Sequence, residues 1–94
     1  MTAMERQIHA VLFPHVEYEL GDYCRRRGLA SERPLPRGWR NAKCDVLALW
    51  SHIHHGREVF VTADGNFHAR TKKPALVALG AGEICRPMDA VALV

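Results

Sequence analysis

Two aspartates, Asp45 and Asp64, are the acidic residues best placed for chemistry in this chain of 94 residues. Asp45 falls within the first turn or so of a predicted helix. Asp64 follows a β-branched and aromatic run, Val59–Thr62, and ligands of open parallel sheets bind at the carboxyl ends of strands. Because the helix leads straight into this strand, we expect both carboxylates to converge at one sheet edge. Two carboxylates can hold a hard divalent cation, with water filling the remaining positions.

Each aspartate also has an ordinary structural interpretation. Asp64 and Gly65 form an Asp-Gly turn, in which the aspartate side chain bonds to its own backbone. Asp45 complements the dipole near a helix N-terminus, an interaction worth about 0.3–1 kcal/mol. The joint arrangement of the two residues, rather than the position of either one, is what favours a metal site.

Histidines near the end of the same helix form a rival constellation: His52, His54 and His55. A zinc site needs three or four converging ligands, and the nearest further candidates are Glu58 and His68. Alternatively, the imidazoles face solvent at the helix C-terminus, where a positive charge is favourable. His52 lies seven residues after Asp45, on nearly the same line of the helix. We therefore also predict that His52 borders the acidic site and contacts phosphate when it is protonated.

Hydrophobic periodicity and turn residues predict the elements that must position these groups. The expected helices cover Met4–Leu12, His15–Arg27, Asn41–His55, Thr71–Leu79 and Met88–Val94, and the expected strands cover Val59–Thr62 and Glu83–Cys85. Residues 30–38 form a proline-bearing loop. Asn41 is the expected N-cap of the third helix, Gly28 and Gly56 are expected helix stops, and Pro87 fits a first helical position.

The alternation of helix and strand after residue 41 predicts an α/β architecture with a parallel sheet. Apolar faces are expected on the second helix (Val16, Leu20, Tyr23, Cys24) and on the third (Val46, Leu49, Trp50, Ile53). The strand Val59–Thr62 is expected to be buried, because parallel sheets need cover on both faces. However, only two strands are credible, and two short parallel strands rarely form a stable sheet alone.

Composition favours one small folded domain that carries no membrane span. The hydrophobic fraction of 48% and the charged fraction of 24% argue against disorder. No apolar run approaches the roughly 20 residues needed to cross a bilayer. Glu5 and Arg6 interrupt the N-terminal segment where a signal peptide needs an apolar core, so a cytoplasmic location is expected. Cys24, Cys44 and Cys85 have no metal or redox spacing and are expected to be buried or partly buried thiols.

The formal net charge of +3 and the pI near 9.0 permit a polyanionic partner without requiring one. A compact basic run, Arg25–Arg27, ends the second predicted helix, where it offsets the helix dipole. With other cations the run could also form a phosphate-attracting surface: Arg33, Arg37, Arg40, Lys43, Lys72 and Lys73.

The segment NAKCDVLALWSHIHHGREVFVTADGNF resembles the C-terminal signature of PIN-domain proteins. In that family a helix opens with an aspartate and apolar residues, and a strand then ends in a Thr-x-Asp-x-x-Phe motif. Here Asp45 precedes the apolar residues, and the run from Thr62 to Phe67 matches the second motif. The tail from Leu76 to Ala90 is similar to the last helix, strand and closing helix of the family. The resemblance implies a PIN-like domain over residues 1–94, with residues 41–90 matching best and residues 1–40 mostly helical.

The resemblance implies a three-layer α/β/α fold and metal-dependent cleavage of RNA. In the family three or four acids bind Mg²⁺ or Mn²⁺, which activates a water and stabilises the leaving oxygen. Carried over by motif, Asp45 and Asp64 match the later two acids, and Thr62 and Asn66 are supporting groups. The implied partners are RNA and, for a toxin-type member, a protein antitoxin.

The chain departs from the family pattern at its first acid, which ends an N-terminal strand that is missing here. Three upstream acids could serve as a further ligand, and no motif singles one out: Glu5, Glu17 and Glu19. Two carboxylates alone would bind Mg²⁺ weakly. Two hypotheses follow. The chain is a metal-dependent endoribonuclease, or it is a truncated or catalytically incomplete module that binds RNA or a protein partner. In either case, another copy or another chain could complete the sheet.

Overall fold

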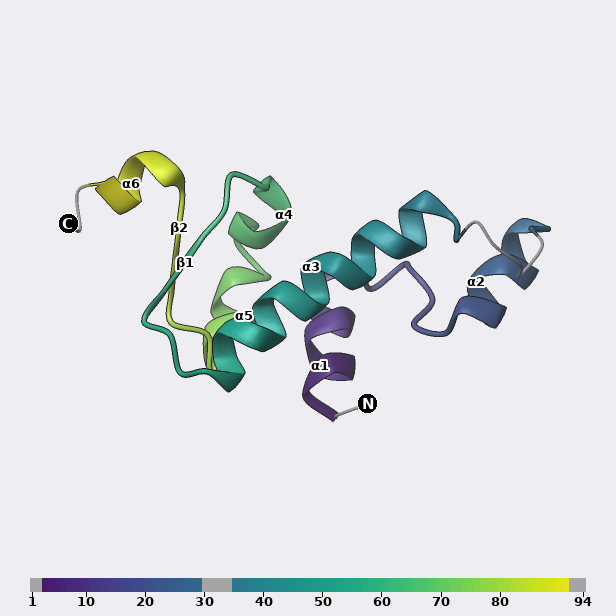
Figure 1. The fold of residues 1–94 in the computed structure, drawn as a ribbon, viewed down its shortest axis with the longest axis horizontal. Coiled ribbons are helices and arrows are strands. Elements are labelled where there is room, and N and C mark those ends of the chain that lie inside the picture. The colour runs from purple at the N-terminus through teal and green to yellow at the C-terminus, as the bar shows by residue number, and fades with distance from the viewer. Residues whose placement is uncertain (1–2, 30–34, 92–94) are drawn as a thin grey trace.

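A long helix, α3 (Arg37–His54), forms the axis of the molecule, and the other elements lie along it (Figure 1). The computed structural model describes residues 3–29 and 35–91 of the chain. Besides α3, these residues form α1 (Ala3–Leu12), α2 (Leu20–Arg27), β1 (Val59–Val61), α4 (Gly65–His68), α5 (Lys73–Ala78), β2 (Glu83–Cys85) and α6 (Pro87–Val91). The molecule measures 46 × 25 × 23 Å, with α2 at one end and the sheet at the other.

The hydrophobic core lies where α1 and the sheet end of the molecule meet α3. Apolar side chains three or four residues apart give each helix one buried face. On α1 these residues are Ile8 and Leu12, and on α3 they are Val46 and Leu49. The elements after α3 complete the core with Phe67, Leu76, Ala81 and Ile84. This packing fixes the end of α1 against the segment that follows β1.

The two strands form a parallel sheet in which Val59 lies opposite Glu83 and Val61 lies opposite Cys85. β2 has the predicted bounds, whereas β1 ends one residue earlier than predicted. The prediction of a buried strand is wrong for β1. Val59 and Val61 are exposed and only Phe60 is partly buried, because no described element covers the outer face of β1.

The second helix begins at Leu20 rather than at His15, because tertiary contacts use the carbonyl groups of the preceding segment. The Val16 carbonyl accepts a hydrogen bond from Nε2 of His9 at 2.6 Å, and the Tyr18 carbonyl accepts one from Nε1 of Trp39 at 3.3 Å. A helix would need both oxygens for its own amides. The helix ends as predicted at Gly28, which adopts φ 66°.

The third helix begins at Arg37, four residues before the predicted N-cap. Pro36 is the N-cap, and its carbonyl accepts a hydrogen bond from the amide of Arg40 at 3.0 Å. Asn41 is therefore an exposed residue inside the helix, and the predicted loop does not extend to residue 38. Residues 30–34 of that loop lie outside the described residues.

Smaller differences concern the segment after β1. The predicted turn at Gly65 is a one-turn helix, α4, and the helix expected over Thr71–Leu79 is the shorter α5. The closing helix α6 begins at Pro87 as predicted, and residues 92–94 lie outside the described part of the chain. The fold is therefore a mixture of helices and strands with a parallel pair, compatible with the α/β prediction.

Two further observations concern the cysteines and the membrane prediction. Cys24 and Cys85 are buried thiols, whereas Cys44 is exposed on α3, contrary to the prediction. Within residues 3–29 and 35–91, no helix combines the length and the apolar character needed to cross a bilayer.

Candidate active site

Asp64 lies directly after β1, where it begins the short helix α4. It is the N-cap of that helix, and its Oδ1 accepts a hydrogen bond from the amide of Asn66 at 2.9 Å. The amide of Asp64 in turn donates to Oγ1 of Thr62 at 3.1 Å. The turn therefore has the ordinary aspartate cap. It also holds an exposed carboxylate in a fixed position at the end of the strand.

Asp45 lies on α3, partly buried, close enough to Asp64 for the two charges to interact. Burial raises the pKa of the Asp45 carboxyl, and the negative charge of Asp64 raises that pKa further. The structure thus brings together the two acids that the sequence singles out. Because like charges repel, a cation between them would relieve an unfavourable interaction.

A cleft of about 520 Å³ opens beside Asp64, between the end of α1 and the start of α5. Its polar groups include Asn66, Lys72 and His15. The ammonium group of Lys72 donates to Oδ1 of Asn66 at 2.5 Å and to the Leu12 carbonyl at 2.9 Å. Nδ2 of Asn66 donates to the same carbonyl at 2.9 Å. These bonds attach the segment that carries Asp64 to the end of α1.

Thr62 and Asn66, the two predicted supporting residues, both bond to Asp64: the Thr62 hydroxyl accepts from the Asp64 amide, and the Asn66 amide donates to the Asp64 carboxylate. Lys72 was predicted only as one of several surface cations, but it lies in the same cleft as Asp64. Its two polar contacts join residues that are 60 and 6 positions apart in the chain. The longer contact has no local sequence signal.

His52 does not lie beside the acids as predicted, because its ring is buried in the core. Its Nε2 accepts a hydrogen bond from the amide of Gly82 at 3.0 Å, and the ring packs edge-on against Phe60. Burial lowers the pKa of His52. A neutral, buried ring that accepts this bond supports the sheet and cannot serve as a phosphate contact. The sequence held a signal for this role, since His52 falls three residues after Leu49 on the core face.

The histidines of the alternative metal site also lie in different environments. His54 and His55 are exposed, and the His54 ring stacks on Trp50 at 4.7 Å. His68 bonds to the Thr62 carbonyl at 2.8 Å. Across the part of the chain that the structure describes, no group of three or more His, Cys, Asp or Glu residues is arranged to hold a metal.

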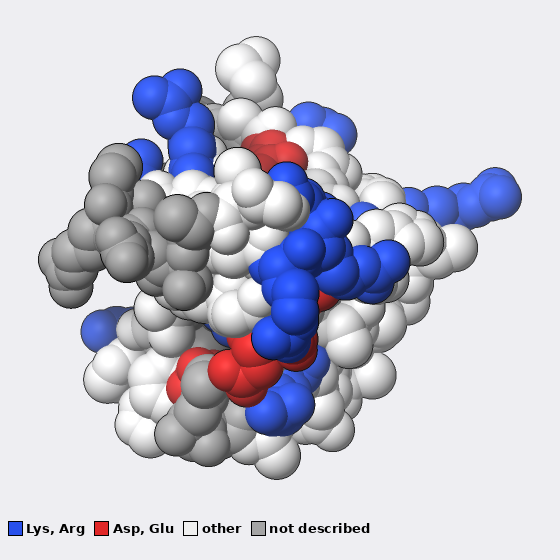
Figure 2. Space-filling model, turned by 90° about the vertical axis from the view of Figure 1, so that its right-hand side faces the viewer, with Lys and Arg blue, Asp and Glu red and all other residues white. Residues whose placement is uncertain are grey.

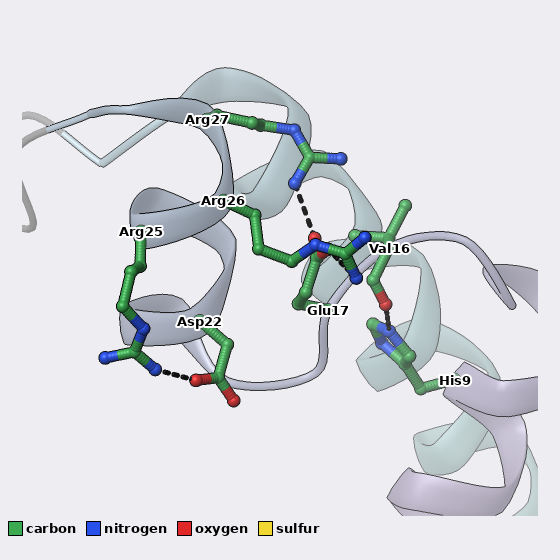
Figure 3. Close-up of polar contacts among 7 residues, drawn as sticks. All are labelled: His9, Val16, Glu17, Asp22, Arg25, Arg26 and Arg27. Atoms are coloured by element: carbon green, nitrogen blue, oxygen red, sulfur yellow. Dashed lines mark hydrogen bonds and ion pairs between the residues drawn. The ribbon is translucent and has the colours of Figure 1, made fainter.

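The upstream acids that were candidate ligands lie elsewhere. Glu17 forms ion pairs with Arg27 at 2.5 Å and with Arg26 at 3.2 Å (Figure 3), and the Arg27 bond lowers the pKa of Glu17. Glu19 pairs with Arg6 at 3.2 Å. Glu5 and Glu19 line a different cleft of about 440 Å³. None of the three shifts the pKa of Asp45, so the acidic pair gains no third carboxylate from them.

Cations gather on the face of the molecule at the α2 end, with acids among them (Figure 2). Arg25 forms an ion pair with Asp22, in addition to the two arginine pairs of Glu17 (Figure 3). The guanidinium of Arg27 also lies over the Tyr23 ring, 3.9 Å from its centroid. The predicted basic run is thus partly neutralised within the fold, which weakens its attraction for phosphate.

A second buried histidine, His9 on α1, was not predicted to matter. Its Nε2–H donates to the Val16 carbonyl, whereas its Nδ1 is buried without a hydrogen-bond partner among the described residues. Burial lowers the pKa of His9 most, the Val16 bond opposes this, and Lys43 lowers the pKa further. Both buried histidines are therefore neutral in the folded state near pH 7.

We expect the free energy of unfolding to fall as the pH is lowered from about 7.5 to about 5.5. The folded-state pKa values of His9 and His52 are lowered, so their contribution is present above about pH 6.5 and is lost as the pH falls through the lowered values. His52→Gln retains an acceptor for the Gly82 amide but cannot titrate. Urea unfolding should show a flatter pH dependence for this variant. A slope equal to that of the wild type would contradict a role for His52.

Comparisons of the chain with family models, with curated protein sequences and with solved structures found no match. The side chains described above therefore carry the functional proposal.

Proposed function

We propose that Asp45 and Asp64 belong to a PIN-like, Mg²⁺- or Mn²⁺-dependent site that hydrolyses phosphodiester bonds in RNA. The observation that carries the proposal is that the two carboxylates interact: burial raises the pKa of Asp45 most, and the nearby charge of Asp64 raises it further. Like-charged acids held near one another, here one on α3 and one directly after β1, are typical of cation sites. The motifs around both residues support the same activity.

The donor set fits a small hard cation. Mg²⁺ is commonly held by one or two carboxylates together with substrate phosphate, and it keeps several of its waters. Asp45 and Asp64 would hold such an ion. The bound ion would supply an activated water and would stabilise negative charge on the phosphate. With two carboxylates and no third, binding in the absence of substrate is expected to be weak.

The surrounding residues can position a phosphodiester beside the acids. Lys72 donates to two neutral oxygens, so these bonds hold the ammonium group in place without cancelling its charge. It lines the cleft together with Asp64 and His15. A fixed positive charge at this edge attracts a phosphate group and offsets the repulsion between that phosphate and the acids.

A second candidate function is a catalytically incomplete PIN-like module that binds RNA or a protein partner, such as the antitoxin of a toxin-type member. Two observations on the described residues favour it. The acidic pair has no third carboxylate, and the sheet has two strands. Under this alternative the chain would retain its fold and its RNA or protein binding without hydrolysing RNA.

RNA cleavage distinguishes the two candidates. A short single-stranded RNA labelled at one end should be cleaved in Mn²⁺ and left intact in EDTA. Asp64→Asn preserves the cap of α4 but removes a ligand charge, and should lower the cleavage rate by about 100-fold or more. The matched control is Asp22→Asn, which alters an exposed acid on α2. A folded wild-type chain that shows no Mn²⁺-dependent cleavage would contradict the nuclease and leave the binding module.

A further inference from the structure

One edge of β1 carries backbone groups that do not face β2. The amide of Thr62 donates to Cys85 at 3.0 Å, and the carbonyl of Glu58 accepts from Glu83 at 2.8 Å. Successive residues of a strand direct their backbone groups to alternate sides. Glu58, Phe60 and Thr62 therefore face β2, and the N–H and C=O groups of Val59 and Val61 face the opposite side.

This edge is open along the described part of the chain. Backbone hydrogen bonds outside the β1–β2 ladder and the helices include none to Val59 or Val61 among the described residues. Val59 and Val61 are 36% and 49% exposed. An edge with free amides and apolar side chains readily pairs with another strand.

We propose that β1 pairs in antiparallel fashion with β1 of a second copy of this chain, so that two sheets join into one. The pairing is self-complementary about Phe60. A two-fold axis there sets Val59 opposite Val61 of the partner subunit, and such a pair exchanges both of its N–H···O bonds. The β1 strand of a second copy has the same length as this edge, the free backbone groups that pair with it, and the same apolar side chains. The proposal does not depend on nuclease activity.

One other feature of the monomer agrees with this pairing. Phe60 is only partly buried, although its ring packs on His52 at 5.3 Å and on Phe67 at 5.2 Å. The two-fold axis sets Phe60 beside Phe60 of the partner subunit, where aromatic cross-strand pairs are favourable. The paired segment needs only the three residues of β1, Val59–Val61, which hold the pairing groups on the free edge.

Sedimentation equilibrium and paired charge substitutions test the register. The wild type should have twice the mass of the 10.6 kDa chain. Val59→Lys/Val61→Lys sets like charges directly opposite in both cross-strand pairs and should raise Kd by about tenfold or more. Val59→Lys/Val61→Glu instead sets opposite charges across from one another and should restore the dimer. The control, Leu47→Lys/Val77→Lys, alters two residues on other elements that are 48% and 49% exposed, and it should remain dimeric.

Amide hydrogen exchange gives a second measurement on the unmodified protein. The Val59 and Val61 amides should become protected as the protein concentration rises, because they are bonded only in the dimer. A monomeric wild type overturns the proposal. A dimer that persists in the double lysine variant, or Val59 and Val61 amides that exchange at the same rate at all concentrations, also overturns it. If the double lysine variant fails to fold, the wild-type mass and exchange still decide.

Discussion

Gly82→Ala is expected to lower the stability of this fold strongly. A Cβ at this position would lie 2.1 Å from the carbonyl oxygen of Glu58 and 2.9 Å from that of Arg57. Both are backbone atoms, so the strand itself would have to move. The shift would also disturb the bond from the Gly82 amide to His52 and the neighbouring bond from Glu83 to Glu58. We expect a loss of about 3 kcal/mol or more, against total stabilities of about 5–15 kcal/mol.

Urea unfolding monitored by circular dichroism measures this loss. The matched control is Gly21→Ala on α2, where an added Cβ meets no atom within 4 Å. Alanine is favoured over glycine in helices, so this variant should be unchanged or more stable by up to about 1 kcal/mol. If Gly82→Ala unfolded at the wild-type urea concentration, the close approach between the β2 entry and β1 would be incorrect.

Local sequence signals predicted the elements whose bounds depend on nearby residues. A β-branched and aromatic run between glycines indicated β1, and β2 was predicted with its observed bounds. Gly28 and Pro87 end and begin helices as their backbone preferences require. These choices need no information from the rest of the chain.

The errors arise where distant contacts override local preference. The segment before α2 has a helical pattern, yet His9 and Trp39 bond to its carbonyls from other elements. Likewise, Asn41 is a favourable N-cap, but the helix already begins after Pro36. The two acids of the candidate site were predicted from their motifs, whereas the contact of Lys72 with Leu12 spans 60 positions and has no local signal. The seven-residue spacing places His52 in line with Asp45. Its position three residues after Leu49 also places it next to the core face of the helix.

Asp45→Asn is expected to stabilise the metal-free protein at pH 7.5. This pH lies about one unit above the usual pKa of histidine, so the buried histidines do not titrate there. The folded-state pKa of Asp45 is raised, so the folded state binds its proton more tightly than the unfolded state does. As the pH rises through that value, the folded state must hold a charge that the unfolded state holds more easily, and the free energy of unfolding falls. Asparagine does not ionise and avoids this loss. Thermal unfolding in EDTA should therefore give a higher Tm for the variant than for the wild type.

Added Mn²⁺ should reverse that order, because only the wild type keeps both carboxylates for the cation. A ligand at about a hundredfold excess over its Kd stabilises the folded state by about 2.7 kcal/mol. Asp45→Asn should lose most of this gain, whereas Asp22→Asn, in an ion pair on α2, should keep it. An aspartate with a purely structural role would lower the Tm when replaced and would not alter the response to Mn²⁺. A lower Tm of Asp45→Asn in EDTA, or an undiminished Mn²⁺ response, would therefore count against the acidic pair as a cation site.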